Sequence, residues 1–381
     1  MLGYLEKQNP HWFGEGDPHL ERWASMGLRW IPSWIYRLTM KPFSLNFVVG
    51  PRRVGKTTGM KIIISKLLEK GVDPRKIVYV DVDLIPELEF FQRLLGFLCE
   101  EGFEYIFIDE ATSLENWWKP LKGFIDLGLL DGSVVTVSGS VSLKVKKHAE
   151  LFPGRMGGGV SIDVLPLSFP EVFSALKLKP KAENVRRCFE EYLDTGGFPG
   201  SLNHEKSFLH EFIIAFQSEI AKAGLSERIT FQIVSSILSK IPSPLSYQSI
   251  ASDVGIDHKT VRSYIERLEN MYILKIAYWK SDGRISFRKE KKIFFRDPFI
   301  YHALSYWTGT ETLESAIYEG VVQEHLYRRF KEIYYTRNRF EIDCLAGNLR
   351  VEVKAGKPHR RYPRNVTLLG KEDIPLFLLK L

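Results

Sequence analysis

Short apolar runs alternate with amphipathic stretches in the first half of the chain. The apolar runs lie at Leu45–Val49, Ile77–Val82, Tyr105–Ile108, Val134–Val137 and Val160–Val164. The stretches between them carry apolar residues at helical spacing and lie at Thr57–Lys70, Glu87–Cys99 and Leu114–Leu129. Strands that alternate with helices are typical of a parallel sheet with helices on both faces. The pattern therefore predicts an α/β domain over residues 1–175, which includes an N-terminal extension.

The pattern changes after this domain. Residues 176–225 carry helical spacing that is interrupted by the turn-forming run Thr195–Gly200, and they predict a helical lid. Residues 226–290 contain two short helices on either side of Gly255, followed by two strand-like runs. This order predicts a winged helix-turn-helix. Residues 291–381 combine a helix, a hairpin and a terminal apolar run, and they predict a small α/β domain.

The composition is that of a globular protein. The chain has 381 residues, more than one hydrophobic core usually supports, and 44% of them are hydrophobic. No apolar run approaches the roughly 20 residues that cross a bilayer, and the N-terminus lacks the apolar core of a signal peptide. The cysteines are far apart without C-x-x-C spacing, which argues against a disulfide framework or a zinc site. We therefore expect a cytoplasmic protein with no membrane contact.

The positive charge is concentrated in the C-terminal part of the chain. The formal net charge is +7, from 53 basic and 46 acidic side chains. Residues 1–225 hold 27 of the basic and 28 of the acidic ones, so residues 226–381 hold the other 26 and 18. Such asymmetry favours a polyanionic partner for the C-terminal part, although charge alone is equally compatible with a solvated basic face.

One segment fits the phosphate-binding motif G-x-x-x-x-G-K-[ST], between an apolar run and a helical stretch. Its residues are Gly50, Pro51, Arg52, Arg53, Val54, Gly55, Lys56, Thr57 and Thr58. Glycines let backbone N–H groups wrap the phosphates, and the helix N-terminus favours their negative charge. In this motif Lys56 neutralises the β- and γ-phosphates, and the Thr57 hydroxyl binds Mg²⁺. The segment therefore predicts a site for a nucleoside triphosphate with Mg²⁺.

An acidic pair follows a later apolar run. Tyr105–Ile108 is succeeded by Asp109 and Glu110. Phosphoryl transfer requires a group near the metal and a group that orients the attacking water, and this order supplies Asp109 for the first role and Glu110 for the second. The alternative is a pair that only caps the helix that follows. We favour hydrolysis because both required groups are present.

Several short motifs resemble one family. They are N-P-H-W (9–12), the phosphate-binding segment, F-I-D-E (107–110), V-S-G-S (137–140), F-P-G-R (152–155), L-P-L-S-F (165–169), G-G-F-P (196–199), Y-E-G-V-V-Q-E (318–324) and E-V-K (352–354). Together they resemble archaeal ATPases of the AAA superfamily that carry a winged helix and a C-terminal restriction-endonuclease-like domain of unknown function. The resemblance implies that the nucleotide is ATP.

The resemblance also implies roles for two further residues. Ser138, or its neighbour Ser140, would sense the γ-phosphate, although a capping serine fits the same position. Arg155 lies in a glycine-rich loop and would be an arginine finger that reaches the phosphate of a neighbouring subunit in a homo-oligomer. A surface arginine is an equally good interpretation.

The C-terminal residues predict contact with nucleic acid. The second helix of the helix-turn-helix and the wing carry basic side chains suited to DNA phosphates. They are His258, Lys259, Arg262, Arg267, Lys280, Arg284, Arg288 and Lys289. Glutamates on the same helix dilute this charge, and a winged helix can also serve as a lid or a protein contact.

A nuclease-like motif follows. A hairpin through Gly347 and Asn348 would bring Asp343 beside Glu352 and Lys354, the D…E-x-K arrangement of the restriction-endonuclease fold. With Glu324 from the preceding helix, the acids would form a second Mg²⁺ site. The alternative is an exposed hairpin with a Glu352–Lys354 salt bridge. The segment after Lys354 is broken by glycine and proline where the family usually has a helix, which argues against the usual docking of substrate there. The basic loop that remains could still hold a phosphate backbone.

These observations leave three functions open. The first is a Mg²⁺-dependent ATPase whose nucleotide cycle acts on a DNA-contacting C-terminal module. The second is an ATP-dependent switch that works through protein partners and has an inactive nuclease fold. The third is a nuclease gated by ATP.

Overall fold

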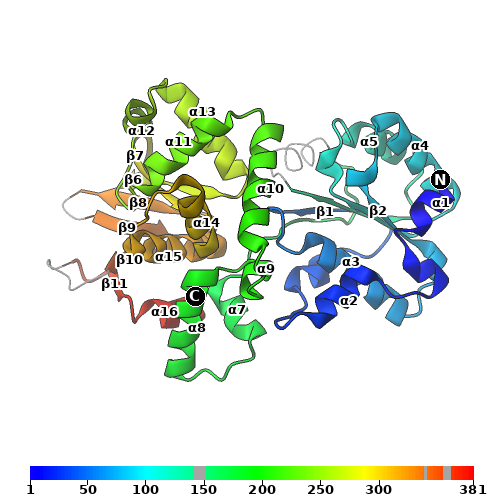
Figure 1. Ribbon diagram of the computed structural model, residues 1–381, viewed down its shortest axis with the longest axis horizontal. Coiled ribbons are helices and arrows are strands. Elements are labelled where there is room, and N and C mark those ends of the chain that lie inside the picture. Colours follow the sequence, from blue (N-terminus) through cyan, green and yellow to red (C-terminus); the bar gives the residue numbers. More distant parts are fainter. Residues whose placement is uncertain (141–151, 339–340, 355–361) are drawn as a thin grey trace. The chain divides into compact units, whose positions relative to one another are not determined.

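The computed structural model describes residues 1–140, 152–338, 341–354 and 362–381. It divides into two compact units, Met1–Leu165 (unit 1) and Pro166–Leu381 (unit 2). Figure 1 shows the elements of both units along the chain. In the described part of the chain, no helix is both long and apolar enough to span a membrane.

Unit 1 is built on a five-stranded sheet in the order β2-β3-β4-β1-β5. Its strands are β1 (Ser44–Val49), β2 (Ile77–Asp81), β3 (Tyr105–Asp109), β4 (Val134–Gly139) and β5 (Ser161–Asp163). All neighbouring pairs are parallel, as the sequence pattern predicts. The central strands are buried along nearly their whole length, which explains why they read as continuous apolar runs. The predicted α/β class with a parallel sheet is confirmed.

Helices cover both faces of this sheet. Figure 1 shows α4 and α5 on one face and α2 and α3 on the other. The helical elements are α1 (Leu2–Glu6), η1 (Pro10–Phe13), α2 (Pro18–Ser25), η2 (Ser33–Arg37), α3 (Lys56–Glu69), η3 (Pro74–Lys76), η4 (Val82–Leu84), α4 (Leu88–Glu100), η5 (Ala111–Ser113) and α5 (Trp118–Asp126). Helix α5 begins later than the predicted Leu114, because a short 3₁₀ turn and a left-handed residue, Asn116 (φ 59°), precede it.

The N-terminal extension covers one edge of the sheet. The Asn9 amide accepts a hydrogen bond from the Tyr79 N–H at 2.7 Å and donates one to the Tyr79 carbonyl at 2.9 Å. The Trp12 indole donates to the Ile77 carbonyl at 2.8 Å. An edge strand leaves such backbone groups without a strand partner. The N-P-H-W motif therefore completes β2, a role that the sequence pattern did not reveal.

Unit 2 begins earlier than the sequence pattern predicts. The division lies after Leu165 rather than at 175/176, and α7 (Phe169–Ala175) belongs to unit 2. Two hydrogen bonds donated by backbone N–H groups tie this segment to unit 2. The Leu167 N–H donates to the Gly197 carbonyl at 2.9 Å, and the Phe169 N–H donates to the His325 ring at 3.0 Å. These contacts join residues far apart in sequence, and no local pattern indicates them.

Helices make up most of unit 2. They are α7, α8 (Ala182–Thr195), α9 (Pro199–Leu202), α10 (Phe208–Lys222), α11 (Glu227–Leu238), α12 (Tyr247–Val254), α13 (His258–Asn270), α14 (Pro298–Thr308), α15 (Glu314–Phe330) and α16 (Ile374–Lys380). Gly255 ends α12 in the left-handed conformation (φ 74°), and Asp257 caps α13 two residues later. The two short helices expected around Gly255 are thus present.

The second sheet joins segments that the sequence pattern assigns to two domains. Its order is β11-β10-β9-β8-β6-β7. The strands are β6 (Leu274–Ser281), β7 (Arg284–Phe295), β8 (Tyr334–Arg337), β9 (Glu341–Ala346), β10 (Leu349–Lys354) and β11 (Thr367–Gly370). The expected wing hairpin, β6–β7, pairs through β6 with β8 of the expected nuclease-like domain.

The boundary expected at 290/291 therefore falls inside a strand. The charged run Arg288–Lys292 hides the continuation of β7, because its side chains lack the apolar pattern of a strand. Lys291 and Lys292 are nevertheless both buried. Helix α15 packs against β7, β9 and β10 and lies over the charged centre of this sheet.

Candidate functional site

The phosphate-binding segment forms a loop between β1 and α3 in unit 1. Gly55 (φ 90°) and Arg53 (φ 65°) both adopt the left-handed conformation, which turns the chain into the helix. A Cβ added to Gly50 would lie 1.9 Å from the Val164 carbonyl oxygen. Helix α3 starts directly after the loop, at Lys56. The loop therefore has the strand, glycine and helix context that the motif requires.

The Lys56 side chain lies across this loop. Its ammonium donates to the carbonyls of Gly50 and Pro51, both at 3.0 Å, and lies 3.6 Å from Oε1 of Glu110. Only 3% of its surface is exposed. A buried cation held by the loop's own carbonyls is placed to bind phosphate oxygens that enter the loop.

Asp109 is the centre of a hydrogen-bond network. Its Oδ2 accepts from the Thr57 hydroxyl at 2.6 Å and from the Tyr79 hydroxyl at 2.7 Å. Its Oδ1 accepts from the Ser138 hydroxyl and from the Glu110 N–H at 3.1 Å. Asp109 is 1% exposed, and its carboxylate is fixed by donors from α3, β2 and β4 and by the N–H of the following residue. Thr57 and Asp109, the two residues expected to serve Mg²⁺, thus touch each other through oxygen atoms of the type that this ion prefers.

Glu110 has an unusual backbone and an unpaired oxygen. It follows β3 with φ 47°, a left-handed conformation that costs a non-glycine residue about 1–2 kcal/mol. Its Oε2 is buried and has no hydrogen-bond partner among the described residues. A buried carboxylate oxygen without a donor is costly, so it marks a place for a water or substrate group. Such local strain is typical of functional sites.

The two serines at the end of β4 lie on the acidic pair and its neighbour. Ser138 accepts a hydrogen bond from the Glu110 N–H at 3.0 Å while donating to Asp109. Ser140 bonds to Thr112, its N–H donating at 3.3 Å. Ser138 is therefore the serine that contacts the predicted catalytic residues.

Three residues of this site escaped the sequence analysis. Tyr79 and Asp81 lie on the same face of β2, and Asp81 pairs in register with Asp109. Burial raises the pKa of Asp81 to about 6, and the Asp109 carboxylate adds to this effect. The His19 ring lies 2.8 Å from the Thr58 hydroxyl. The sequence does contain a signal for Tyr79 and Asp81, because polar residues two positions apart at the end of a buried strand point to the same side of the sheet.

Arg155 lies apart from the loop residues, on the surface of unit 1. Its guanidinium pairs with Asp126 and donates to the Pro153 carbonyl at 3.3 Å. About a third of the side chain is exposed. An ion pair exposed to solvent contributes little stability, so little opposes its release toward another partner.

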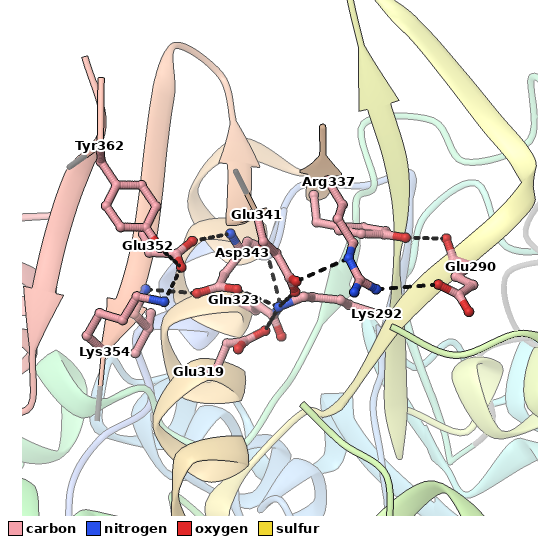
Figure 2. Close-up of polar contacts among 12 residues, drawn as sticks. Glu290, Lys292, Glu319, Gln323, Arg337, Glu341, Asp343, Glu352, Lys354 and Tyr362 are labelled. Carbon is pink, nitrogen blue, oxygen red and sulfur yellow. Dashed lines mark hydrogen bonds and ion pairs between the residues drawn. The ribbon is translucent and has the colours of Figure 1, made fainter. Parts of the chain in front are cut away.

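The second expected site lies in the sheet of unit 2, where β9 and β10 bring Asp343, Glu352 and Lys354 together (Figure 2). The Asp343 N–H donates to Oε2 of Glu352 at 3.2 Å, and Oδ2 of Asp343 accepts from the Val353 N–H at 2.9 Å. Oε1 of Glu352 accepts from the Lys354 ammonium and from the Tyr362 hydroxyl, the latter at 2.9 Å. The carboxylates of Asp343 and Glu352 are thus already engaged by donors within the protein.

Glu324 does not join these residues, contrary to expectation. Its carboxylate binds Arg296 at 2.8 Å and Arg328 at 2.9 Å. Burial alone would raise the pKa of Glu324, but the two guanidinium groups outweigh it and hold the pKa below its usual value. The reason is helical geometry. Glu319 on α15 faces the sheet, and Glu324 follows five positions later. A separation of five residues places two side chains on different faces of an α-helix, so Glu324 cannot face the sheet as well.

A residue that the sequence analysis missed occupies the centre of this cluster. The Lys292 ammonium lies 2.5 Å from Oδ1 of Asp343, 2.7 Å from Oε1 of Glu319 and 2.9 Å from Oε1 of Glu341. The described residues include no group of His, Cys, Asp and Glu side chains that could hold a metal ion. The second Mg²⁺ site expected from the resemblance therefore does not fit the residues that are present.

The basic residues around α13 and the β6–β7 hairpin differ in availability. Lys259, Arg284, Arg288 and Lys289 are exposed, as is the aromatic ring of Phe287 (66%). Arg262 instead pairs with Glu266, and Arg267 donates to the Ala223 carbonyl at 2.6 Å. Arg360 and Arg361, in the basic segment after Lys354, lie outside the described residues.

Two protein-family models match the chain. Residues 43–173 match a model described as an AAA domain, and residues 186–311 match one described as a domain of unknown function (DUF8612). No curated protein matches the chain. The first match agrees with the loop and sheet described above and extends past Leu165, so residues 43–173 are similar to AAA domains.

Solved structures with some similarity include two proteins of Aeropyrum pernix. The Orc1 protein, in complex with DNA, is 15% identical over 69% of this chain and 86% of its own, with a TM-score of 0.36. The Orc2 protein, in ADPNP–ADP complexes, is 11% identical over 70% of this chain and 89% of its own, with a TM-score of 0.39. Similarity at this level carries no conclusion about function.

Proposed function

We propose that unit 1 binds ATP with Mg²⁺ and hydrolyses it. The observation that carries this proposal is the buried, unpaired Oε2 of Glu110, on a carboxylate whose other oxygen lies 3.6 Å from the Lys56 ammonium. One end of this carboxylate is thus near the phosphate-binding cation, and the other is available to a water molecule.

The proposed roles follow from these positions. Lys56 exchanges the Gly50 and Pro51 carbonyls for phosphate oxygens, and the N–H groups of the loop hold the β-phosphate. The Thr57 hydroxyl, which donates to Asp109 here, would hold Mg²⁺, and Asp109 would stay in place beside it because Tyr79 and Ser138 also donate to its carboxylate. Bound Mg²⁺ neutralises charge on the β- and γ-phosphates.

Glu110 orients the attacking water. Its free Oε2 accepts a hydrogen bond from the water, whose oxygen forms a bond to the γ-phosphorus as the bond to the bridging oxygen breaks. The products are ADP and phosphate. The Glu110 N–H remains bound to Ser138, which keeps the strained backbone in position.

The test is nucleotide binding by a Lys56→Ala variant, measured with a fluorescent ATP analogue in the presence of Mg²⁺. We expect binding to be lost, because the variant lacks the cation that faces the phosphates. Lys70→Ala, an exposed position just after α3, is the matched control and should bind normally. Undiminished binding by Lys56→Ala would show that the loop is not the nucleotide site.

DNA contact by unit 2 is a second candidate function. The exposed side chains of Lys259, Arg284, Arg288 and Lys289 support it, since they combine positive charge with the exposed ring of Phe287. Binding to DNA phosphates releases counterions, so affinity should fall steeply with salt. Exchange of these four residues for alanine should flatten the slope of log affinity against log salt by about one unit for each phosphate that the variant no longer neutralises.

The measurement is fluorescence anisotropy of labelled duplex DNA over a salt series, with and without ATP. Lys206→Ala, which removes an exposed lysine elsewhere in unit 2, is the control. An effect of ATP on affinity would support coupling between the nucleotide cycle and DNA contact. If the affinity for DNA does not depend on salt and is unchanged in the variant with four alanines, the switch that acts through protein partners is favoured instead.

A further inference from the structure

The acidic cluster of unit 2 draws its members from β7, β9 and α15, and α15 packs against both strands. Glu341 and Asp343 are two apart on β9 and share a face, Lys292 comes from β7, and Glu319 comes from α15 above the sheet (Figure 2). All but Glu341 are almost completely buried. The cluster therefore has a defined interior, which solvent reaches mainly past Glu341.

We infer that the Lys292 ammonium takes the position that a divalent cation would need in this cluster, so that the centre is closed to Mg²⁺ and Mn²⁺. The inference concerns unit 2 alone and does not depend on ATP hydrolysis. It replaces the expectation of a metal-dependent nuclease centre at Asp343 and Glu352.

The first argument is the geometry of the ammonium. It has three N–H donors, and three carboxylate oxygens lie around it at 2.5, 2.7 and 2.9 Å. Two of these contacts, to Glu319 and Asp343, are hydrogen bonds, and the third, to Glu341, is an ion pair. Mg²⁺ requires several oxygens at about 2.0–2.1 Å. A metal ion bound to Oδ1 of Asp343 would compete with the ammonium for this oxygen and would be repelled by its positive charge at close range.

The second argument is that the remaining oxygens are also used. Oδ2 of Asp343 accepts from the backbone of Val353, and Oε2 of Glu352 accepts from the backbone of Asp343. Oε1 of Glu352 holds Lys354 and Tyr362. A metal ion would have to compete with these donors for the lone pairs of both carboxylates.

The third argument is the balance of charge. Glu319, Glu341, Asp343 and Glu352 face two lysine ammonium groups, and Arg337 lies 3.7 Å from Glu341. Burial and the Asp343 carboxylate raise the pKa of Glu319 to about 8, and the same two causes raise the pKa of Glu352. Both carboxyl groups therefore hold a proton more readily than usual, which reduces the negative charge that could attract a dication.

The fourth argument is that Lys292 is held in place. It lies in the middle of the β6–β7 ladder, where it pairs in register with Ala277, and its side chain is 3% exposed. The Glu319 oxygen that it contacts is fixed in turn by the Gln323 amide at 3.0 Å. Departure of the ammonium would leave buried carboxylates without a counterion. The lysine is thus a permanent occupant of the centre.

The experiment counts Mn²⁺ bound to the full chain by electron paramagnetic resonance, without nucleotide. The wild type should show no Mn²⁺ site that is sensitive to Asp343→Asn. Lys292→Met keeps the approximate length of the side chain but removes the charge. This variant should gain one Mn²⁺ site per chain in unit 2, and that site should bind Mn²⁺ at least tenfold more tightly than any site in unit 2 of the wild type. The double variant Lys292→Met/Asp343→Asn should lose that site again.

Two results would overturn the inference. One is a wild-type Mn²⁺ site that Asp343→Asn or Glu352→Gln removes. The other is a Lys292→Met protein with a wild-type circular dichroism spectrum that gains no site. If Lys292→Met does not fold, the wild-type count still decides, because the inference requires that no such site exist there. DNA cleavage by the wild type that needs Mn²⁺ and is lost in Lys354→Ala would also contradict it.

Discussion

Exchange of Tyr79 for phenylalanine tests how the P-loop site holds Asp109. The change removes only the hydroxyl, which donates to Oδ2 of Asp109 at 2.7 Å, and keeps the ring that lies 3.6 Å from the Lys61 ammonium. A hydrogen bond to a buried charged acceptor contributes about 1.5–3 kcal/mol. In the free protein, the Thr57 hydroxyl still donates to the same oxygen at 2.6 Å.

The effect should appear mainly when nucleotide is bound. If Thr57 turns to the metal ion, Oδ2 of the variant loses both of its donors, and the carboxylate is then held only through Oδ1, by Ser138 and the Glu110 N–H. If the full contribution is lost at that stage, kcat falls roughly 10- to 150-fold, by the relation of about 1.4 kcal/mol per factor of ten. The Mg²⁺ concentration that gives half the maximal rate should rise as well, because Asp109 supports the metal.

The assay is steady-state release of phosphate over a series of Mg²⁺ concentrations at saturating ATP. Tyr105→Phe is the matched control and should behave as the wild type. Tyr105 is partly exposed and lies at the first position of β3, at the end of the strand away from Asp109. The reasoning is refuted if Tyr79→Phe retains kcat and its Mg²⁺ dependence within twofold while its melting temperature falls, since the hydroxyl would then serve only stability.

Three further predictions concern the same unit. Gly50→Ala should abolish ATP binding, because its Cβ would lie 1.9 Å from the Val164 carbonyl oxygen; normal binding would exclude this close packing. The pKa of Asp81 is raised from 3.8 to about 6, so the native state holds the extra proton and stability falls as pH rises between these values. The free energy of unfolding of Asp81→Asn, measured with urea, should therefore rise relative to that of the wild type as the pH increases over that range. A difference between the two proteins that does not change with pH would contradict the raised pKa. If Arg155 is a finger in trans, ATPase activity per chain should fall on dilution and Arg155→Ala should remove that dependence; equal activity at all concentrations would rule the role out.

The nucleotide site was accessible from sequence because its determinants are local. Gly50 to Thr58 follow one strand and start one helix, and Asp109 and Glu110 end another strand. The parallel order of the sheet then brings these strand ends together. Tyr79 escaped notice since a tyrosine inside an apolar run reads as core packing.

The centre of unit 2 was only partly accessible. Alternation along a hairpin places Asp343 beside Glu352, which a sequence can indicate. Lys292 could not be foreseen, because its partners Glu319 and Asp343 lie 27 and 51 residues away on other elements. The prediction that Glu324 joins the acidic cluster was wrong for a related reason. The sequence indicates that α15 is helical, but it does not show which face of the helix meets the sheet, and Glu319 rather than Glu324 lies on that face.

Turnover by Glu110→Gln, measured beside ATP binding in the same preparation, tests the central claim most directly. The exchange keeps the shape of the side chain and removes the charge that orients the attacking water, so the account predicts wild-type binding of ATP with a loss of hydrolysis of about a hundredfold or more. Equal loss of binding and turnover, or turnover that persists, would contradict the role assigned to the unpaired oxygen of Glu110.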